Sequence, residues 1–139
     1  MLRRFARVTA IEALYQAESY QAGCCNREKD LEAICNEALL RNDIVNEQQR
    51  QFVRELIRGT WEHRHEYDEA ISGRSKGWPL HRMGRVEVAI MRMALHEIRR
   101  MDTPRSVVIN EAVELAKEYA SGRAAAFING ILGSLVAET

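Results

Sequence analysis

The stretch from Thr103 to Leu135, TPRSVVINEAVELAKEYASGRAAAFINGILGSL, predicts two consecutive helices that pack against each other. Pro104 suits the first position of a helix, with Thr103 before it as the N-cap. We expect this helix to end at Ala120-Ser121-Gly122, where a small residue and a glycine follow the apolar series. Apolar residues at spacings of three and four mark its inward face, namely Val108, Ala112, Leu115, Ala116 and Tyr119.

A second helix follows the break at Gly122. Gly130 and Gly133 have no side chain, so we expect a neighbouring backbone to approach this helix closely at both positions. The residues with helical spacing on its inward face are Phe127, Ile128, Ile131, Leu132 and Leu135.

The rest of the chain has the same periodicity, and no stretch alternates between apolar and polar residues. We therefore expect an all-α fold of six to seven helices. The first four helices are expected at about 3–20, 28–40, 47–72 and 84–101, and a short turn is expected at 79–83. The expected inward residues of the second, third and fourth helices are Leu31, Ile34, Cys35, Ala38 and Leu39, then Phe52, Val53, Leu56, Ile57, Thr60, Trp61 and Ile71, and then Val86, Ile90, Met93, Ala94 and Ile98.

Length and charge limit the classes of function. A chain of 139 residues predicts a single domain, 1–139. The formal net charge is zero, from 20 basic and 20 acidic residues, so any attraction to nucleic acid must be local. Arginine makes up 17 of the basic residues, which is compatible with RNA binding, but the base composition of the genome is the favoured explanation, since it produces the same bias in proteins that bind no nucleic acid. No apolar run reaches the roughly 20 residues of a membrane span. The opening MLRRFARVTA lacks signal-peptide features, so we expect a cytoplasmic protein.

Three segments together resemble one known family. INEAVELAKEY followed by FINGILGSL resembles the C-terminal signature of the NusB family of bacterial transcription antitermination factors. RRFARVTAIEALYQAE, residues 3–18, resembles the arginine-rich opening helix of that family, and GWPLHRMGRVEVAIMRMALHEI, residues 77–98, resembles its central helix. The resemblance implies two small helical bundles packed across one another.

The resemblance also implies a function. A NusB-like adaptor would bind boxA-like single-stranded RNA of ribosomal RNA transcripts together with the ribosomal protein NusE, and would join the antitermination complex on RNA polymerase. The alternative is a substrate-recognition module related to the N-terminal domain of RNA cytosine methyltransferases. No methyltransferase sequence follows Thr139, so we expect the adaptor. The chain contains no phosphate-binding loop, His-Glu-x-x-His pair or nucleophile elbow, so we expect neither enzymatic activity nor a cofactor.

The first ten residues contain Arg3, Arg4 and Arg7 and no acidic residue. On a helix, Arg3 and Arg7 lie one turn apart, and Arg4 points about 100° away from Arg3. Such a cluster can neutralise the phosphates of single-stranded RNA, whereas the alternative is a solvated helix end. The family resemblance favours RNA binding, and we expect all three side chains to be exposed.

Two further basic positions are candidates for RNA binding. Arg123 lies in the break before the last helix, where Ser121 is a suitable N-cap, and the resemblance implies that this loop shares the RNA surface. The SGRAAAF sequence here departs from a commoner family version with acidic, His and Lys residues. Lys76 lies beside Trp78 and Arg82, a basic and aromatic combination that suits RNA. Trp78 and Phe127 can each stack on a base, but packing against the core is favoured for both.

The resemblance places Tyr15 and Glu87 where the family meets NusE. The alternative is that Tyr15 packs inside and Glu87 is simply exposed. The cysteines Cys24, Cys25 and Cys35 include no Cys-x-x-Cys pair, so we expect no metal site and assign them to packing and to a loop.

Overall fold

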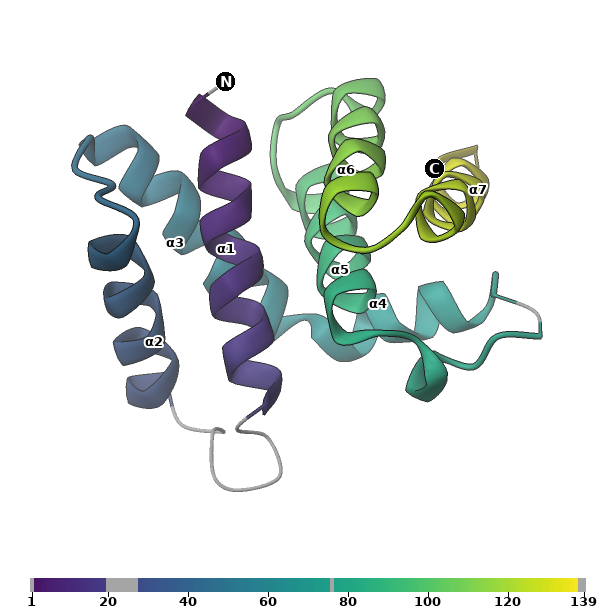
Figure 1. The fold of residues 1–139 in the computed structure, drawn as a ribbon, viewed down its shortest axis with the longest axis horizontal. Coiled ribbons are helices and arrows are strands. Elements are labelled where there is room, and N and C mark those ends of the chain that lie inside the picture. Colours follow the sequence, from purple (N-terminus) through teal and green to yellow (C-terminus); the bar gives the residue numbers. More distant parts are fainter. Residues whose placement is uncertain (1, 20–27, 76, 138–139) are drawn as a thin grey trace. The chain divides into compact units, whose positions relative to one another are not determined.

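The computed structural model describes residues 2–19, 28–75 and 77–137. Within these ranges the chain forms seven α-helices, one short 3-10 helix and no strand, which confirms the all-α prediction (Figure 1). No helix in the described ranges is long and apolar enough to cross a membrane. The elements are α1 (Leu2–Ser19), α2 (Glu28–Arg41), α3 (Glu47–Glu62), α4 (Arg64–Ser72), η1 (Leu80–Arg82), α5 (Arg85–Arg100), α6 (Arg105–Tyr119) and α7 (Gly122–Ala137).

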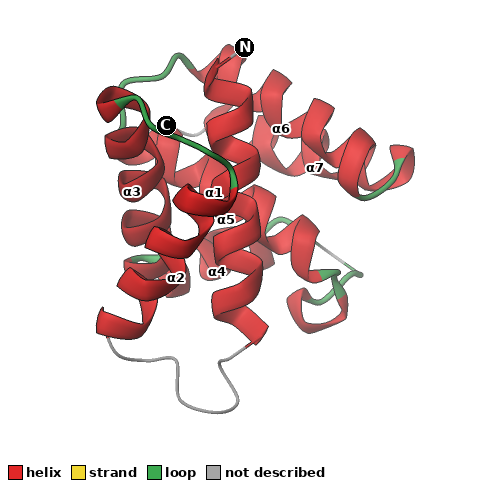
Figure 2. Cartoon of the chain, turned by 60° about the vertical axis from the view of Figure 1, so that its left-hand side comes forward, coloured by secondary structure: helices red, strands yellow, loops and turns green. Residues whose placement is uncertain are grey.

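The chain divides into two compact units, Met1–Glu62 with α1 to α3 and His63–Thr139 with α4 to α7. We expected one continuous helix over 47–72, and this prediction was wrong. The backbone leaves helical geometry at His63, with φ −103° and ψ 18°, so α3 ends and α4 begins around this residue. The Tyr67 N–H donates to the His63 carbonyl at 3.2 Å and starts the new helix. Figure 2 shows the helices and the connecting loops from a second direction.

In the first unit, α1 packs against both α2 and α3. Its inner face consists largely of alanines without exposed surface, which lets the neighbouring helices approach closely. Every residue that we expected to face inward on α2 and α3 is buried, and so is Ile71 of α4. The buried alanines of α1 are Ala6, Ala10, Ala13 and Ala17.

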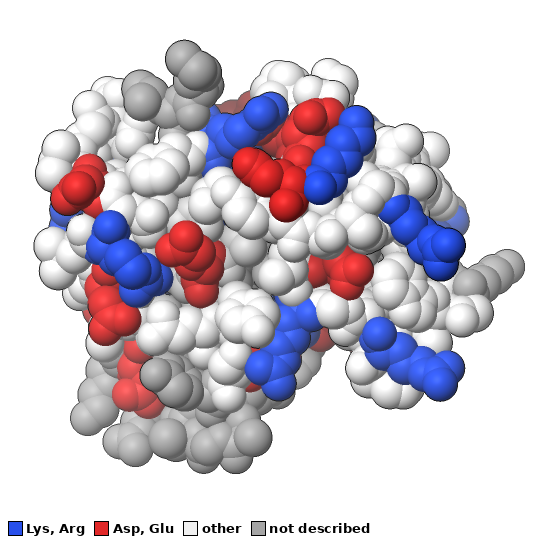
Figure 3. Space-filling model, in the orientation of Figure 1, with Lys and Arg blue, Asp and Glu red and all other residues white. Residues whose placement is uncertain are grey.

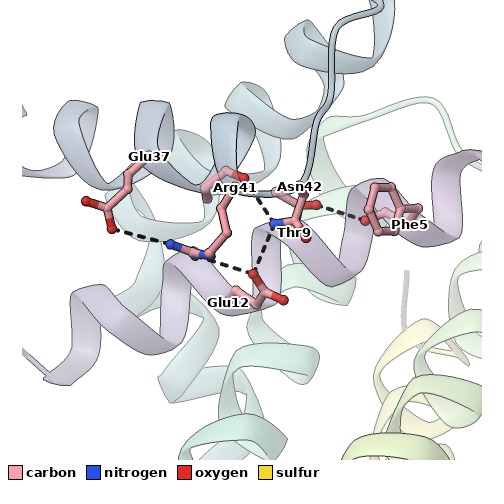
Figure 4. Close-up of polar contacts among 7 residues, drawn as sticks. Phe5, Thr9, Glu12, Glu37, Arg41 and Asn42 are labelled. Carbon is pink, nitrogen blue, oxygen red and sulfur yellow. Dashed lines mark hydrogen bonds and ion pairs between the residues drawn. The ribbon is translucent and has the colours of Figure 1, made fainter.

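Polar contacts join α1 to the end of α2 (Figure 4). The Glu12 carboxylate accepts a hydrogen bond from Asn42 Nδ2 at 3.0 Å and one from Arg41 at 3.3 Å. Arg41 also pairs with Glu37 one turn earlier on α2. On α1 itself, the Thr9 hydroxyl donates to the Phe5 carbonyl at 3.1 Å. The two hydrogen bonds to Glu12 therefore join α1 to the end of α2.

In the second unit, α5 contacts α4, α6 and α7 and is buried from Val88 to Glu97. Of its expected core residues, Ile90, Met93 and Ala94 are buried, whereas Val86 and Ile98 are half-buried. On α6 and α7, the expected core residues are also buried, except two. Tyr119 is 47% exposed because it is the last residue of α6, and Phe127 is half-buried.

The expected close approach at Gly130 and Gly133 was wrong. Both are exposed, and an added Cβ at either would have no atom within 4 Å among the described residues. At 100° per residue, Gly130 lies about 200° from the buried Ile128, on the outer side of α7. The two glycines therefore serve no helix contact that the structure describes.

The two predicted N-caps had different outcomes. Pro104 has φ −58° and ψ 142°, so it is itself the N-cap of α6 rather than its first helical residue, and the predicted role of Thr103 was wrong. The Pro104 carbonyl accepts the first hydrogen bond of the helix, from the Val108 N–H at 3.1 Å. Ser121 caps α7 as predicted, because its Oγ accepts a hydrogen bond from the Ala124 N–H at 3.0 Å.

Candidate nucleic-acid interface

The three arginines of α1 differ in exposure. Arg3 and Arg4 are exposed, whereas Arg7 is only 3% exposed, so the expectation of three exposed side chains was wrong for Arg7. The cause is α3, whose Phe52 lies beneath both Arg3 and Arg7. Spacing along α1 alone could not reveal which side of the cluster a neighbouring helix covers.

Arg3 and Arg7 lie over the same aromatic ring. The Arg3 guanidinium carbon is 4.1 Å from the centroid of the Phe52 ring, and that of Arg7 is 5.6 Å from it. Both distances are within the range of an attractive cation–π interaction. Phe52 was expected only as a core residue, and its role under the arginines was missed. One signal could have indicated this role. Arg3 and Arg7 are four residues apart, and an aromatic residue on a neighbouring helix can lie under such a pair.

Charge on the visible surface is mixed. Figure 3 shows basic and acidic side chains interspersed over the face it displays. This agrees with the zero formal net charge and with the need for a local basic cluster. The first turns of α1 meet that need, because Arg3, Arg4 and Arg7 occur there without an acidic residue between them.

The second unit contains the other basic candidates for RNA binding and the aromatic residues near them. Arg123 is exposed, but it lies in the first turn of α7 rather than in the break before it. Lys76 lies outside the described residues. Arg82 is exposed in η1. Trp78 is half-buried, and its ring meets Phe127 edge to face, with centroids 4.3 Å apart and an interplanar angle of 68°. The two aromatic side chains thus pack on each other while each keeps part of its surface exposed.

The two partner-binding candidates have distinct settings. Tyr15 is 44% exposed on α1, which contradicts the alternative that it packs inside. Glu87 is half-buried, and its Oε1 accepts a hydrogen bond from the Gly84 N–H at 2.6 Å. Glu87 therefore stabilises the start of α5, a role that the sequence analysis did not include.

A polar network in the second unit was also missed. The hydroxyl of Tyr67 lies within hydrogen-bonding distance of His96, and Arg100 donates both to that hydroxyl and to Glu66. The hydrogen bonds from Arg100 and Arg99 lower the pKa of Glu66, whereas burial raises the pKa of Tyr67. Nearby, Arg92 donates two hydrogen bonds of 2.7 Å to Asp68. These contacts join α4 to α5 and stabilise the second unit.

Metal-ligating side chains do not gather in the described part of the chain, where no group of three His, Cys, Asp or Glu residues could hold an ion. Cys35 is buried on α2, as expected for a packing residue, and its burial raises the pKa of its thiol. Cys24 and Cys25 lie outside the described residues.

Comparison with solved structures supports this architecture. NusB from T. maritima is 31% identical, with a TM-score of 0.80 over 98% of this chain and 91% of that one. A crystal structure of the antitermination factors NusB and NusE in complex with double-stranded RNA has a TM-score of 0.83, covering 99% of this chain and 98% of that one. At 24% identity, the second likeness supports the fold alone.

Sequence comparison extends over nearly the whole chain. The transcription antitermination protein NusB of Symbiobacterium thermophilum is 40% identical over 144 residues, covering 98% of this chain and 90% of that protein. The protein of the same name from Trichlorobacter lovleyi is 41% identical over 138 residues, covering 98% and 91%. The sequence pattern of the NusB family matches residues 4–137, which include the arginine-rich start of α1, the central α5 and the paired helices α6 and α7. This chain therefore belongs to the NusB family.

Proposed function

We propose that this protein is a transcription antitermination factor, a non-catalytic adaptor that acts in the cytoplasm. As one NusB-like domain, 1–139, it binds boxA-like single-stranded RNA of ribosomal RNA transcripts together with the ribosomal protein NusE, within the antitermination complex on RNA polymerase. The observation that carries the proposal is the arginine cluster at the start of α1, two of whose side chains are exposed, in a chain of the NusB family.

Arg3 and Arg4 supply the electrostatic part of RNA binding. Each guanidinium can form two parallel hydrogen bonds with a phosphate, which favours arginine over lysine at such contacts. A few phosphate contacts give only weak, salt-dependent affinity, so a second protein that lengthens the RNA path raises the effective affinity. Lys76 and Arg123 are proposed as additional RNA contacts, and the exposure of Arg123 in the first turn of α7 supports its inclusion.

Tyr15 and Glu87 are proposed as contacts to NusE. The exposure of Tyr15 supports this assignment, because a large aromatic side chain left on a helix surface is a common anchor of a protein interface. A crystal structure with the same fold contains the antitermination factors NusB and NusE in complex with double-stranded RNA, which supports joint binding of NusE and RNA.

The test is a binding titration with a fluorescently labelled single-stranded boxA RNA, in the presence and absence of purified NusE. We expect salt-dependent binding that tightens when NusE is added. Because the RNA in the related complex is double-stranded, a duplex of the same sequence and a scrambled single strand are measured alongside. Equal affinity for the scrambled RNA would contradict boxA recognition, and an affinity unaffected by NusE would contradict the joint mode of binding.

A further inference from the structure

We propose that Phe52 is a positioning residue for RNA binding, because its ring holds the Arg3 guanidinium in an orientation that suits binding. The buried Arg7 guanidinium lies over the same ring. This inference rests on the proposed RNA binding by the α1 arginines. It assigns an RNA-related role to a side chain of α3 that does not itself touch RNA.

The contacts of the first unit define this arrangement. Phe52 is 8% exposed, and α3, which carries it, packs directly on α1. Because Arg3 and Arg7 are one turn apart on α1, a single ring can serve both side chains, and the guanidinium carbons lie 4.1 Å and 5.6 Å from its centroid. Ala6, which lies between the two arginines in the sequence, has no exposed surface.

The two arginines have different surroundings over the ring. Arg7 is almost fully buried, so little of its guanidinium can reach a phosphate, whereas Arg3 is exposed as well as held. A guanidinium is weakly hydrated and tolerates such a position better than an ammonium would. The Phe52 ring limits the orientations that the Arg3 side chain adopts.

The effect on binding follows from conformational entropy. A free arginine side chain on a helix end samples many rotamers, and fixing it on a phosphate costs conformational entropy. A side chain already held over a ring has fewer rotamers to lose. Removing the ring should therefore weaken RNA binding even though the charge of Arg3 is retained.

The experiment compares Phe52→Leu, which removes the ring and keeps an apolar side chain, with Phe52→Tyr, which keeps the ring. We expect Phe52→Leu to weaken binding of the labelled single-stranded boxA RNA by about threefold to tenfold, as follows from the conformational entropy lost when one long side chain is fixed on binding. Phe52→Tyr should bind close to the parent protein. Ile57→Val, a buried change on the same helix, is the stability control and should leave RNA affinity unchanged.

A double-mutant cycle separates positioning from a general loss of structure. In an Arg3→Ala background, Phe52→Leu should have no further effect on RNA affinity, because the side chain that it positions is absent. An equal loss in both backgrounds, or parental affinity for Phe52→Leu alone, would overturn the proposal. NMR of the free protein gives a second measurement, since the Arg3 side-chain protons should shift away from their ring-current position in Phe52→Leu and not in Ile57→Val.

Failure of the proposed function would look different. If Arg3→Ala and Arg4→Ala both bound RNA like the parent, the RNA site itself would lie elsewhere, whatever the NMR shifts of Arg3. If Arg3→Ala weakened binding and Phe52→Leu did not, the RNA site would stand and the positioning role of Phe52 would fall.

Discussion

The hydroxyl oxygen of Tyr67 lies 2.8 Å from Nδ1 of His96 in the core of the second unit. Arg100 donates a hydrogen bond to the same hydroxyl oxygen at 2.9 Å, and a guanidinium can only donate. The Tyr67 hydroxyl therefore accepts from Arg100 and also forms a hydrogen bond with Nδ1 of His96. The chain of hydrogen bonds runs from the end of α5 into the interior and connects α4 with α5.

Removing the Tyr67 hydroxyl should destabilise the protein. Tyr67→Phe takes away the hydroxyl that pairs with His96 and leaves Nδ1 buried without that hydrogen bond, which typically costs about 1–3 kcal/mol. Urea unfolding followed by circular dichroism measures the change. Tyr15→Phe makes the same chemical change at a side chain that is 44% exposed, and should alter stability by about 0.5 kcal/mol or less. Similar effects of the two variants would contradict the buried hydrogen bond.

The ion pairs of Glu66 should make stability depend on acid pH. Hydrogen bonds from Arg100 and then Arg99 hold the pKa of Glu66 below its usual value of 4.5. A carboxyl group with a lowered folded-state pKa contributes stability above its unfolded-state pKa, and the contribution is lost as pH falls through the folded-state value. Glu66→Gln should therefore be less stable than the parent at neutral pH, and the difference should shrink below pH 4.5. A difference that stayed constant through this range would exclude Glu66 as the titrating group.

The α1 arginines should divide into a surface pair and a core residue. Arg3→Ala and Arg4→Ala should each change stability by about 0.5 kcal/mol or less, because both side chains are exposed. Arg7→Ala removes a side chain that is 3% exposed and should cost about 1–3 kcal/mol. In RNA titrations at several salt concentrations, each surface variant should reduce the slope of log affinity against log salt by about 0.7, as expected for one lost phosphate contact with a single strand. An unchanged slope would remove that arginine from the RNA surface.

Substitutions at Glu87 should separate its two roles. Glu87→Lys loses the bond to the Gly84 N–H and reverses the charge, so it should weaken NusE association and also lower stability by about 1 kcal/mol. Glu87→Gln retains a side-chain oxygen that can accept from Gly84 and removes only the charge.

Calorimetric titration of NusE and unfolding curves are recorded for both Glu87 variants, and RNA affinity without NusE should stay at the parental value for each. If Glu87→Lys bound NusE like the parent, the proposed docking position would be wrong. A loss in Glu87→Lys without any loss in Glu87→Gln would attribute the effect to repulsion or helix capping and not to the native charge.

Periodicity was sufficient to predict the helices and most of their buried faces. Leu31, Leu56 and Ile128 were assigned to the core correctly because each lies on an apolar face with helical spacing. The break at His63 was not predicted because no glycine or proline occurs there and the apolar spacing continues on both sides. A change in the backbone angles of a single residue leaves no compositional signal.

The sequence was sufficient to predict which residues form the candidate site, but not which of their side chains are buried. The sequence indicates an arginine cluster on α1, but the burial of Arg7 depends on where α3 lies, and that contact joins residues far apart in the chain. The capping bond of Glu87 has the three-residue spacing of a known motif and could have been recognised from Gly84. Gly130 and Gly133 were misassigned because a glycine within a helix indicates a possible close approach without saying which side faces a neighbour.

The alanines of α1 make the first unit sensitive to added volume. Ala6, Ala10, Ala13 and Ala17 have no exposed surface, so a larger side chain at any of them would have to be accommodated in the interior of the unit. A single added methyl group there would push α1 outward or force its neighbours off their rotamers, at a typical cost of about 1–3 kcal/mol. At Ala6, such a shift would also lift Arg3 and Arg7 from the ring of Phe52. Variation at a residue that no ligand could reach would then alter nucleic-acid affinity through helix spacing alone.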